Sequence, residues 1–279
     1  MSPLVIGLVL GAALLHASWN AILRGGADRL WSISVMAAIG GAMAVVLALV
    51  LRWPAPDPAS WPYMAASAAL QVGYCLFLVR AYRDGHLAHV YPVARGTAPL
   101  AVTLGAWLVA GEHLTAAALA GVLLVCAGIM TLAIGRDRPD RRTIGAAIAC
   151  GLFIACYMIV DGLGVRRSGH PLSYAAWAMG VAGLAILLAF VAIRRRLPEL
   201  PRGKAGAGAL IGAAISTLGY GIALWAMSGA LMAQVSALRE TSILFAAVLG
   251  ALFLREPFSF RRIVGGISIA AGAICLAAV

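Results

Sequence analysis

Residues 89–112 read HVYPVARGTAPLAVTLGAWLVAGE, an apolar stretch that contains one arginine and two prolines. A helix needs about 20 residues to cross the ~30 Å hydrocarbon core of a bilayer, and this stretch is long enough. Insertion scales place the cost of an arginine such as Arg95 at mid-membrane at about 2.5–3.5 kcal/mol. Pro92 and Pro99 remove backbone donors, and irregular backbone at this depth is tolerated only where it faces protein or a cavity. The stretch therefore predicts a membrane-spanning helix with one face turned to a polar cavity.

The composition of the whole chain indicates an integral membrane protein. Of the 279 residues, 63% are hydrophobic and 11% are charged, whereas a soluble domain carries about 25% charged residues. The net charge of +11 comes from short basic clusters between apolar runs, which argues against a nucleic-acid partner. The cysteines lack metal-binding spacing, and the sequence lacks HExxH, G-x-S-x-G and GxxxxGK[ST] motifs. We therefore expect no cofactor, no metal site and no ATP-driven mechanism.

Hydropathy predicts an all-α fold of ten membrane-spanning helices, with loops too short to hold a separate domain. Basic residues concentrate in the loops after the odd-numbered spans, which predicts that these loops are cytoplasmic and that both termini are outside. Glycine pairs such as Gly7/Gly11 and Gly208/Gly212 have the spacing that lets membrane helices pack closely. The predicted spans are residues 4–23, 31–51, 63–82, 87–110, 114–134, 143–160, 172–193, 205–227, 231–254 and 263–279.

The opening stretch recurs 144 residues later, as AQVSALRETSILFAAVLGALFLRE at residues 233–256. At this offset Arg95 aligns with Arg239 and Glu112 aligns with Glu256, and both residue types are scarce in the chain. Each half then holds five spans, so the second half enters the membrane from the opposite side. Such an inverted-topology repeat is a plan typical of secondary transporters, which bind substrate between the repeats. The two predicted repeats cover residues 1–135 and 143–279.

Polar side chains within the predicted spans are the candidates for a substrate site. Arg95 and Arg239 offer planar donors that match a carboxylate or phosphate, unless their long side chains reach out to the membrane interface. Glu240 is the only acidic residue placed well inside an apolar span, since Asp161 is expected near the membrane surface. Glu240 would either neutralise Arg95 across the repeats or carry a coupling proton. The remaining candidates are Tyr91, on the face of Arg95, and His16, Trp19, Asn20, Tyr74, Tyr157 and Tyr220. His16, Trp19 and Asn20 share one face of the first span and would alternatively form a packed hydrogen-bond cluster.

Three sequence features carry a family resemblance. They are the tryptophan–asparagine pair in HASWN at residues 16–20, the apolar run from Pro99 to Gly111–Glu112, and FLREP at 253–257 followed by Gly265 and Gly266. With these features the chain resembles the ten-helix EamA-type members of the drug/metabolite transporter superfamily. The resemblance implies a secondary carrier, often an exporter of amino acids, other metabolites or drugs, with a cavity lined by helices 1, 3, 4, 6, 8 and 9. It also implies cytoplasmic termini, opposite to the orientation that the charge count predicts.

One departure from the wider superfamily narrows the expected function. Its small four-helix multidrug members use a helix-1 glutamate for proton exchange, and this chain has none there, which argues against cation export by that mechanism. We expect an inner-membrane exporter of a small metabolite, such as an amino acid or organic anion, working by alternating access and not as an enzyme. Its partners would be the substrate, the lipid bilayer and a coupling proton. The alternatives are an intramembrane enzyme acting on lipid-linked substrates and a non-transporting membrane subunit.

Overall fold

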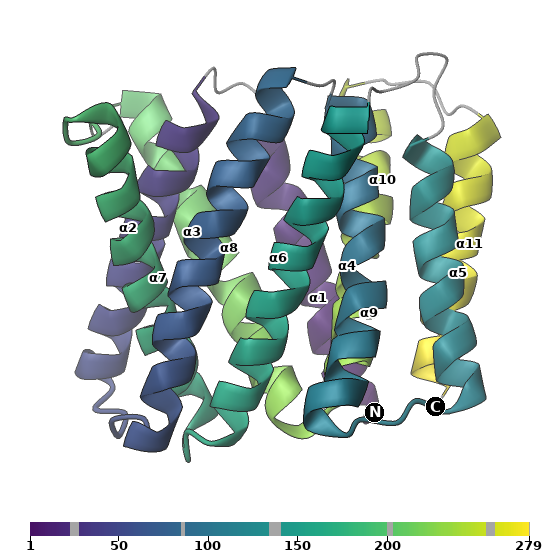
Figure 1. Cartoon of the computed structure of the whole chain (residues 1–279), viewed down its shortest axis with the longest axis horizontal. Helices are drawn as coiled ribbons and strands as arrows, with labels where there is room; N and C mark the ends of the chain where they lie inside the picture. Colours follow the sequence, from purple (N-terminus) through teal and green to yellow (C-terminus); the bar gives the residue numbers. More distant parts are fainter. Residues whose placement is uncertain (23–27, 85–86, 134–140, 200–202, 255–259, 279) are drawn as a thin grey trace.

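The computed structural model describes residues 1–22, 28–84, 87–133, 141–199, 203–254 and 260–278. Within these ranges the regular structure is helical, and the helices run side by side with both chain termini on the same face (Figure 1). The elements are α1 (Pro3–Ile22), α2 (Arg29–Val50), η2 (Pro58–Ser60), α3 (Trp61–Asp84), α4 (Leu87–Ala110), α5 (Ala116–Ala133), α6 (Arg141–Arg166), α7 (Pro171–Arg194), α8 (Gly203–Gly229), α9 (Met232–Arg239), α10 (Ser242–Leu254) and α11 (Phe260–Ala277).

The helices have the length and the apolar surface of membrane spans. In the part of the chain that the structure describes, eight stretches are long and apolar enough to cross a bilayer, and Ala116–Leu132 forms a shorter apolar helix. Large apolar side chains such as Leu104, Leu108, Leu184 and Leu188 are more than half exposed, as expected of surfaces that face lipid. The prediction of an all-α integral membrane fold is confirmed.

The ninth predicted span, residues 231–254, is not a single helix. Helix α9 ends at Arg239 and α10 begins at Ser242. Between them, the backbone N–H groups of Glu240 and Thr241 each bond to the carbonyl three residues back at 3.1 Å, and the Thr241 hydroxyl also bonds backward at 2.7 Å. Such local side-chain bonds compete with the regular α-helical ladder. The break places the Arg239–Glu240 pair at a helix end inside the protein, whereas α4 continues through both of its prolines.

The glycines at close helix contacts, such as Gly128 and Gly265, differ from the Gly7/Gly11 pair predicted from the sequence. Helices α5 and α11 pack so tightly that a Cβ on Gly128 would lie 2.7 Å from the Gly265 carbonyl oxygen. In contrast, a Cβ on Gly7 or Gly11 would have nothing within 4 Å, and one on Gly212 would make only ordinary contact with a methionine at 3.4 Å. The prediction that the Gly7/Gly11 pair serves close packing is wrong, because spacing alone does not show which helix face meets a neighbour.

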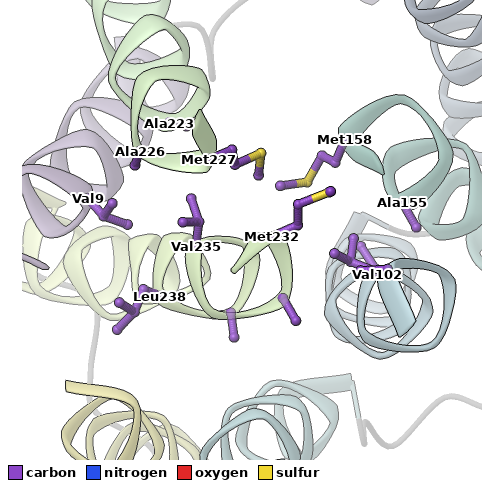
Figure 2. Close-up of a cluster of buried hydrophobic side chains, with 14 of the residues drawn as sticks. Val9, Val102, Ala155, Met158, Ala223, Ala226, Met227, Met232, Val235 and Leu238 are labelled. Carbon is purple, nitrogen blue, oxygen red and sulfur yellow. The ribbon is translucent and has the colours of Figure 1, made fainter. Parts of the chain in front are cut away.

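Apolar side chains fill the centre of the bundle around α9, all of whose residues are buried. The methionines Met158, Met227 and Met232 converge there from α6, α8 and α9 (Figure 2). The same cluster includes Val9 from α1 and Val102 from α4. This dry cluster joins helices of both halves of the chain and forms the floor beneath the site described next.

Candidate functional site

A cavity of about 230 Å³ lies among α1, α2, α3, α4, α6, α7, α8 and the end of α9. Its lining residues come mainly from the second halves of α1, α3 and α8 and from the first halves of α2 and α4. The segments of α1, α2, α3 and α4 lie toward the face opposite to the two termini, whereas α8 starts at that face and lines the cavity with residues near its middle (Figure 1). The apolar cluster around α9 lies nearer the termini, for example through Val9 in the first half of α1 and Met227 at the end of α8. This cluster bounds the cavity on the side of the termini.

The structure brings the sequence-predicted site residues together. Nine of the ten candidates line the cavity, and Glu240 lies just behind its wall, where it is 3% exposed. The nine are His16, Trp19, Asn20, Tyr74, Tyr91, Arg95, Tyr157, Arg239 and Tyr220. These residues come from six different helices but line the same cavity. The search for scarce polar and aromatic residues within the apolar spans therefore found residues that lie close together in space.

Arg95 is paired with Glu240 across the two halves of the chain, as one of the two interpretations of Glu240 predicted. The Arg95 Nε lies 2.8 Å from Glu240 Oε2, in an ion pair whose angle falls outside hydrogen-bond geometry. One Nη atom of Arg95 donates to the Ser242 hydroxyl at 3.3 Å, and its guanidinium lies 5.8 Å from the Tyr91 ring centre. The pair cancels charge, but its hydrogen bonding is incomplete. Arg95 therefore keeps donor capacity at the cavity wall.

Arg239 has a different environment, because no carboxylate of the described residues lies at ion-pair distance from it. Its side chain lines the cavity, and its guanidinium carbon lies 5.3 Å from the ring centre of Tyr220. The residue is only 8% exposed. A buried charge without a counter-ion is costly unless water or a ligand solvates it. The cavity thus carries an excess positive charge at Arg239.

Aromatic rings form one wall of the cavity between the two arginines. The ring centres of Tyr74 and Tyr157 lie 6.1 Å apart, and those of Tyr157 and Tyr220 lie 6.3 Å apart, both in edge-to-face arrangements. Opposite polarity on ring edges and faces makes this geometry favourable. On α1, His16 and Trp19 are also edge to face at 5.1 Å. The wall offers apolar surface to a substrate body and hydroxyl groups to its polar end.

The polar face of α1 has a partly structural role. The Asn20 amide donates to the His16 carbonyl oxygen at 2.8 Å, within the same helix. His16 and Trp19 pack against each other within α1, so these contacts are not the interhelical hydrogen-bond cluster that was the alternative for this face. All three side chains line the cavity, so this face of α1 forms part of its wall.

Helices α2 and α7 also line the cavity, although they were not among the lining helices that the family resemblance implied. They contribute Ile33, Met36, Gly41, Met179 and Gly183, which carry no ionisable groups. Their close approach is set by glycine, since a Cβ on Gly41 would lie 3.1 Å from the Cα of Gly180. No ionisable residue from these helices lines the cavity, so the search for charged and aromatic residues in the spans did not find them.

Asp161 was expected near the membrane surface, but its side chain lies in the protein interior with 0% exposure. Its carboxylate accepts hydrogen bonds from the hydroxyls of Tyr220 at 2.5 Å and Tyr174 at 3.1 Å. Tyr157 precedes it by one helical turn, so this spacing could have pointed to the cavity. The predicted span ended at residue 160, one residue too early to include it.

On the side of the termini, Arg166 of α6 and Glu112, which follows α4, connect these two helices to the end of α8 and the start of α9. Arg166 Nη2 lies 2.5 Å from Glu112 Oε1 and donates to the Ala230 carbonyl at 2.8 Å, while its Nε donates to the Met227 carbonyl at 3.0 Å. The other oxygen of Glu112 accepts from the backbone N–H of Met232 at 2.9 Å, at the start of α9. This pair satisfies backbone groups where α8 ends and α9 begins.

The described residues contain no group of three or more His, Cys, Asp or Glu arranged to hold a metal ion. The described cavity wall carries cationic, aromatic and hydroxyl groups, which are able to bind a small anion.

Comparison with known proteins identifies the family to which the chain is similar. The model of the EamA-like transporter family matches residues 141–278. A solved structure titled "Crystal structure of protein" is similar with a TM-score of 0.80 and 20% sequence identity, covering 98% of each chain, which shows the fold alone. No curated protein matches the chain. The helices span a lipid bilayer many times, and members of the matched family move small molecules. The chain belongs to the EamA-like transporter family, within the drug/metabolite transporter superfamily.

Proposed function

We propose that the chain is a secondary active transporter of the inner membrane that exports a small metabolite bearing a carboxylate, such as an amino acid or organic anion. The observation that carries this proposal is the unbalanced guanidinium of Arg239 in a buried cavity. A carboxylate matches the planar donor fork of arginine and would supply the counter-ion that the described protein residues do not. The cavity volume of about 230 Å³ suits a small solute.

We assign roles to the other residues from their positions in the cavity wall. Arg95 offers a second, partly compensated cation, and Glu240 holds its guanidinium in place. Tyr74, Tyr157 and Trp19 contact the apolar body of the substrate, because their rings line the space near the arginines. Tyr91, Tyr220, His16 and Asn20 add hydrogen-bonding edges to the same wall.

The packing of the helices supports alternating access between two five-helix repeats, residues 1–135 and 143–279. If α6–α11 repeat α1–α5, the contact of α1 with α8 corresponds to the contact of α3 with α6, and both contacts are present. The contacts of α2 with α7 and of α5 with α11 map onto themselves. Exchange of the two repeat conformations would then expose the cavity first to one side of the membrane and then to the other.

The test is transport by purified protein in liposomes. Labelled leucine, phenylalanine and benzoate would serve as carboxylate probes, and labelled phenethylamine as the cationic control. Losing one charge-assisted hydrogen bond costs about 1.5–3 kcal/mol, so we expect Arg239→Ala and Arg95→Ala to slow carboxylate exchange about 10- to 100-fold. The Arg→Lys variants keep the charge but lose the fork, and should fall in between.

Arg196→Ala provides a matched control, because Arg196 is an exposed arginine outside the cavity. Its exchange rate should equal that of the wild type. If Arg95→Ala and Arg239→Ala both exchange the same carboxylate as fast as the wild type, the proposed site is wrong.

A further inference from the structure

Among the described residues three carboxylates are buried, and only two of them have a cationic partner. Glu112 is paired with Arg166 and Glu240 with Arg95. Asp161 is the most deeply buried of the three, and no Arg, Lys or His of the described chain lies at ion-pair distance from it. An ionised carboxylate in such a place costs several kcal/mol unless hydrogen bonds replace its hydration. The Asp161 carboxyl group is therefore in an environment where it can gain and lose a proton.

The partners of Asp161 are all hydroxyl groups, and hydroxyls both donate and accept hydrogen bonds. Tyr174 and Tyr220 can therefore stay hydrogen-bonded to Asp161 whether or not it carries a proton. A guanidinium only donates, so a proton on Glu112 or Glu240 would break their pairs. The hydroxyl cage makes Asp161 the one buried carboxylate of the described residues whose hydrogen bonding tolerates both states.

A hydrogen bond through Tyr220 connects Asp161 to the cavity. Tyr220 lines the cavity and donates to Asp161 Oδ2. Gln71 also lines the cavity and donates at 3.1 Å to the Ser67 hydroxyl, and Ser67 is one of the residues whose electrostatic influence reaches Asp161. Tyr220 is also the residue beneath the Arg239 guanidinium. The Tyr220 hydroxyl therefore links the protonation state of Asp161 to Arg239, the proposed anion contact.

Of the ionisable groups near Asp161, the cations have other contacts and the tyrosines ionise only at high pH. Asp161 is therefore the group expected to change charge. Arg239 faces it only through Tyr220, Arg95 is engaged by Glu240, Arg166 is engaged by Glu112, and Arg167 stacks on Tyr63 at 5.0 Å. The tyrosines described on α6 and on the helices packed around it are Tyr63 and Tyr74 of α3, Tyr91 of α4, Tyr157 of α6, Tyr174 of α7 and Tyr220 of α8. Tyrosines ionise at a pH near 10 in water, far above that of a carboxylate.

We infer that Asp161 is the proton-binding site that couples anion transport to proton movement, an inference that rests on the proposed function. A proton from cavity water bonds to Oδ2 of Asp161, and the new O–H then points at the Tyr220 oxygen. The hydrogen of Tyr220 turns into the cavity, where a carboxylate beside Arg239 accepts it. No covalent bond to the substrate forms or breaks. Proton and anion therefore bind together and move in the same direction, so export proceeds when the metabolite gradient exceeds the proton gradient.

The proton itself is the first probe. In detergent, the infrared difference spectrum between acid and alkaline buffer should contain a protonated-carboxyl band that Asp161→Asn removes. The matched control is Glu199→Gln, which alters an exposed carboxylate and should keep the band. Persistence of the whole band in Asp161→Asn would overturn the inference, independently of any transport assay.

The second measurement separates coupling from transport. With an acid exterior, wild-type liposomes should accumulate labelled leucine, a zwitterion that protein-free liposomes exclude, above the level reached without a pH gradient, and pyranine should report proton entry. Asp161→Asn should lose this accumulation while still exchanging leucine at equal pH. Tyr220→Phe, which keeps the ring beneath Arg239, should also lose the accumulation and serves if Asp161→Asn fails to fold; because its hydroxyl is a proposed substrate contact, its exchange at equal pH is expected to slow as well. Proton-driven accumulation equal to wild type in the folded variants would overturn the inference.

The two proposals fail in different ways. Exchange by the wild type without a component driven by the pH gradient would refute coupling at Asp161 and leave the carrier function standing. Absence of exchange of every carboxylate probe by the wild type would refute the proposed function and the coupling together.

Discussion

Two arginine–glutamate pairs with a buried carboxylate, among the residues that the structure describes, differ in how completely they are bonded. Both oxygens of Glu112 are bonded, to Arg166 and to the backbone at the start of α9, and Arg166 also bonds to two carbonyls where α8 ends. Arg95 and Glu240 lie 2.8 Å apart outside hydrogen-bond geometry, beside the cavity. The first pair is held by the backbone, whereas the second can exchange part of its bonding with a ligand.

The difference teaches that a charged residue inside a membrane protein has to be judged by its bonding as well as by its depth. A fully bonded pair closes one end of the bundle, and a loosely bonded pair beside an unpaired arginine marks the site. The comparison predicts that changes at Glu112 act on stability, while changes at Glu240 act on substrate affinity.

The largest effect is expected from Glu112→Ala. This change leaves the Arg166 guanidinium without a counter-ion and the first N–H of α9 without its cap. Removing one partner of a buried pair costs about 3–5 kcal/mol, and we expect about 3 kcal/mol here, because the Arg166 side chain is 29% exposed. Reversible denaturant unfolding in micelles measures this change. A loss as small as that of a surface pair would contradict the closing role of Glu112.

Gly183→Ala tests the cavity helices that carry no charge. An added Cβ would collide with the Ala37 carbonyl oxygen on α2, and a backbone atom cannot rotate away. Overpacking of this kind costs about 1–3 kcal/mol, and widening the α2–α7 contact should also slow exchange. Gly145→Ala is the matched control, since its Cβ has nothing within 4 Å and should raise stability by about 0.5–1 kcal/mol. Equal unfolding free energies for the two variants would contradict the packing argument.

Glu240→Gln should change binding more than folding. Its amide keeps polar contact with Arg95 but removes the negative charge, so the cavity becomes more positive and the anion binds up to about tenfold more tightly, or ~1.4 kcal/mol. Competition between labelled and unlabelled benzoate in exchange gives the affinity. A weaker affinity with unchanged stability would mean that Glu240 itself contacts the substrate.

The smallest effect is expected at the third arginine–carboxylate pair, Arg194 with Asp28. It has the same chemistry and a 2.9 Å contact, but its side chains are 45% and 43% exposed. Exposed pairs contribute about 0.2–1 kcal/mol and weaken with salt. Arg194→Gln retains the capping bond from Trp31 to Asp28 and should fall in this range. A loss comparable to that of Glu112→Ala would show that burial does not govern the energies of these pairs.

Sequence reasoning reached the cavity because arginine, tyrosine and histidine are scarce in apolar spans and costly to keep there. It could not foresee the break between Arg239 and Ser242, since residues 239–242 contain neither proline nor glycine and only local hydroxyl bonding interrupts the helix. It also placed the end of the sixth span at residue 160. In the structure α6 continues to Arg166, because Arg166 is neutralised by a glutamate 54 residues away in sequence. Asp161 was excluded from the interior by that same boundary.

The central claim is that the Arg239 guanidinium receives the anionic group of the substrate. The most direct test is the exchange rate of benzoate relative to its neutral isostere benzamide, in the wild type and in Arg239→Gln. The account predicts that the wild type strongly prefers benzoate and that Arg239→Gln reduces the preference about 10-fold or more, the value of one charge-assisted hydrogen bond. An unchanged preference in a folded Arg239→Gln protein would contradict it.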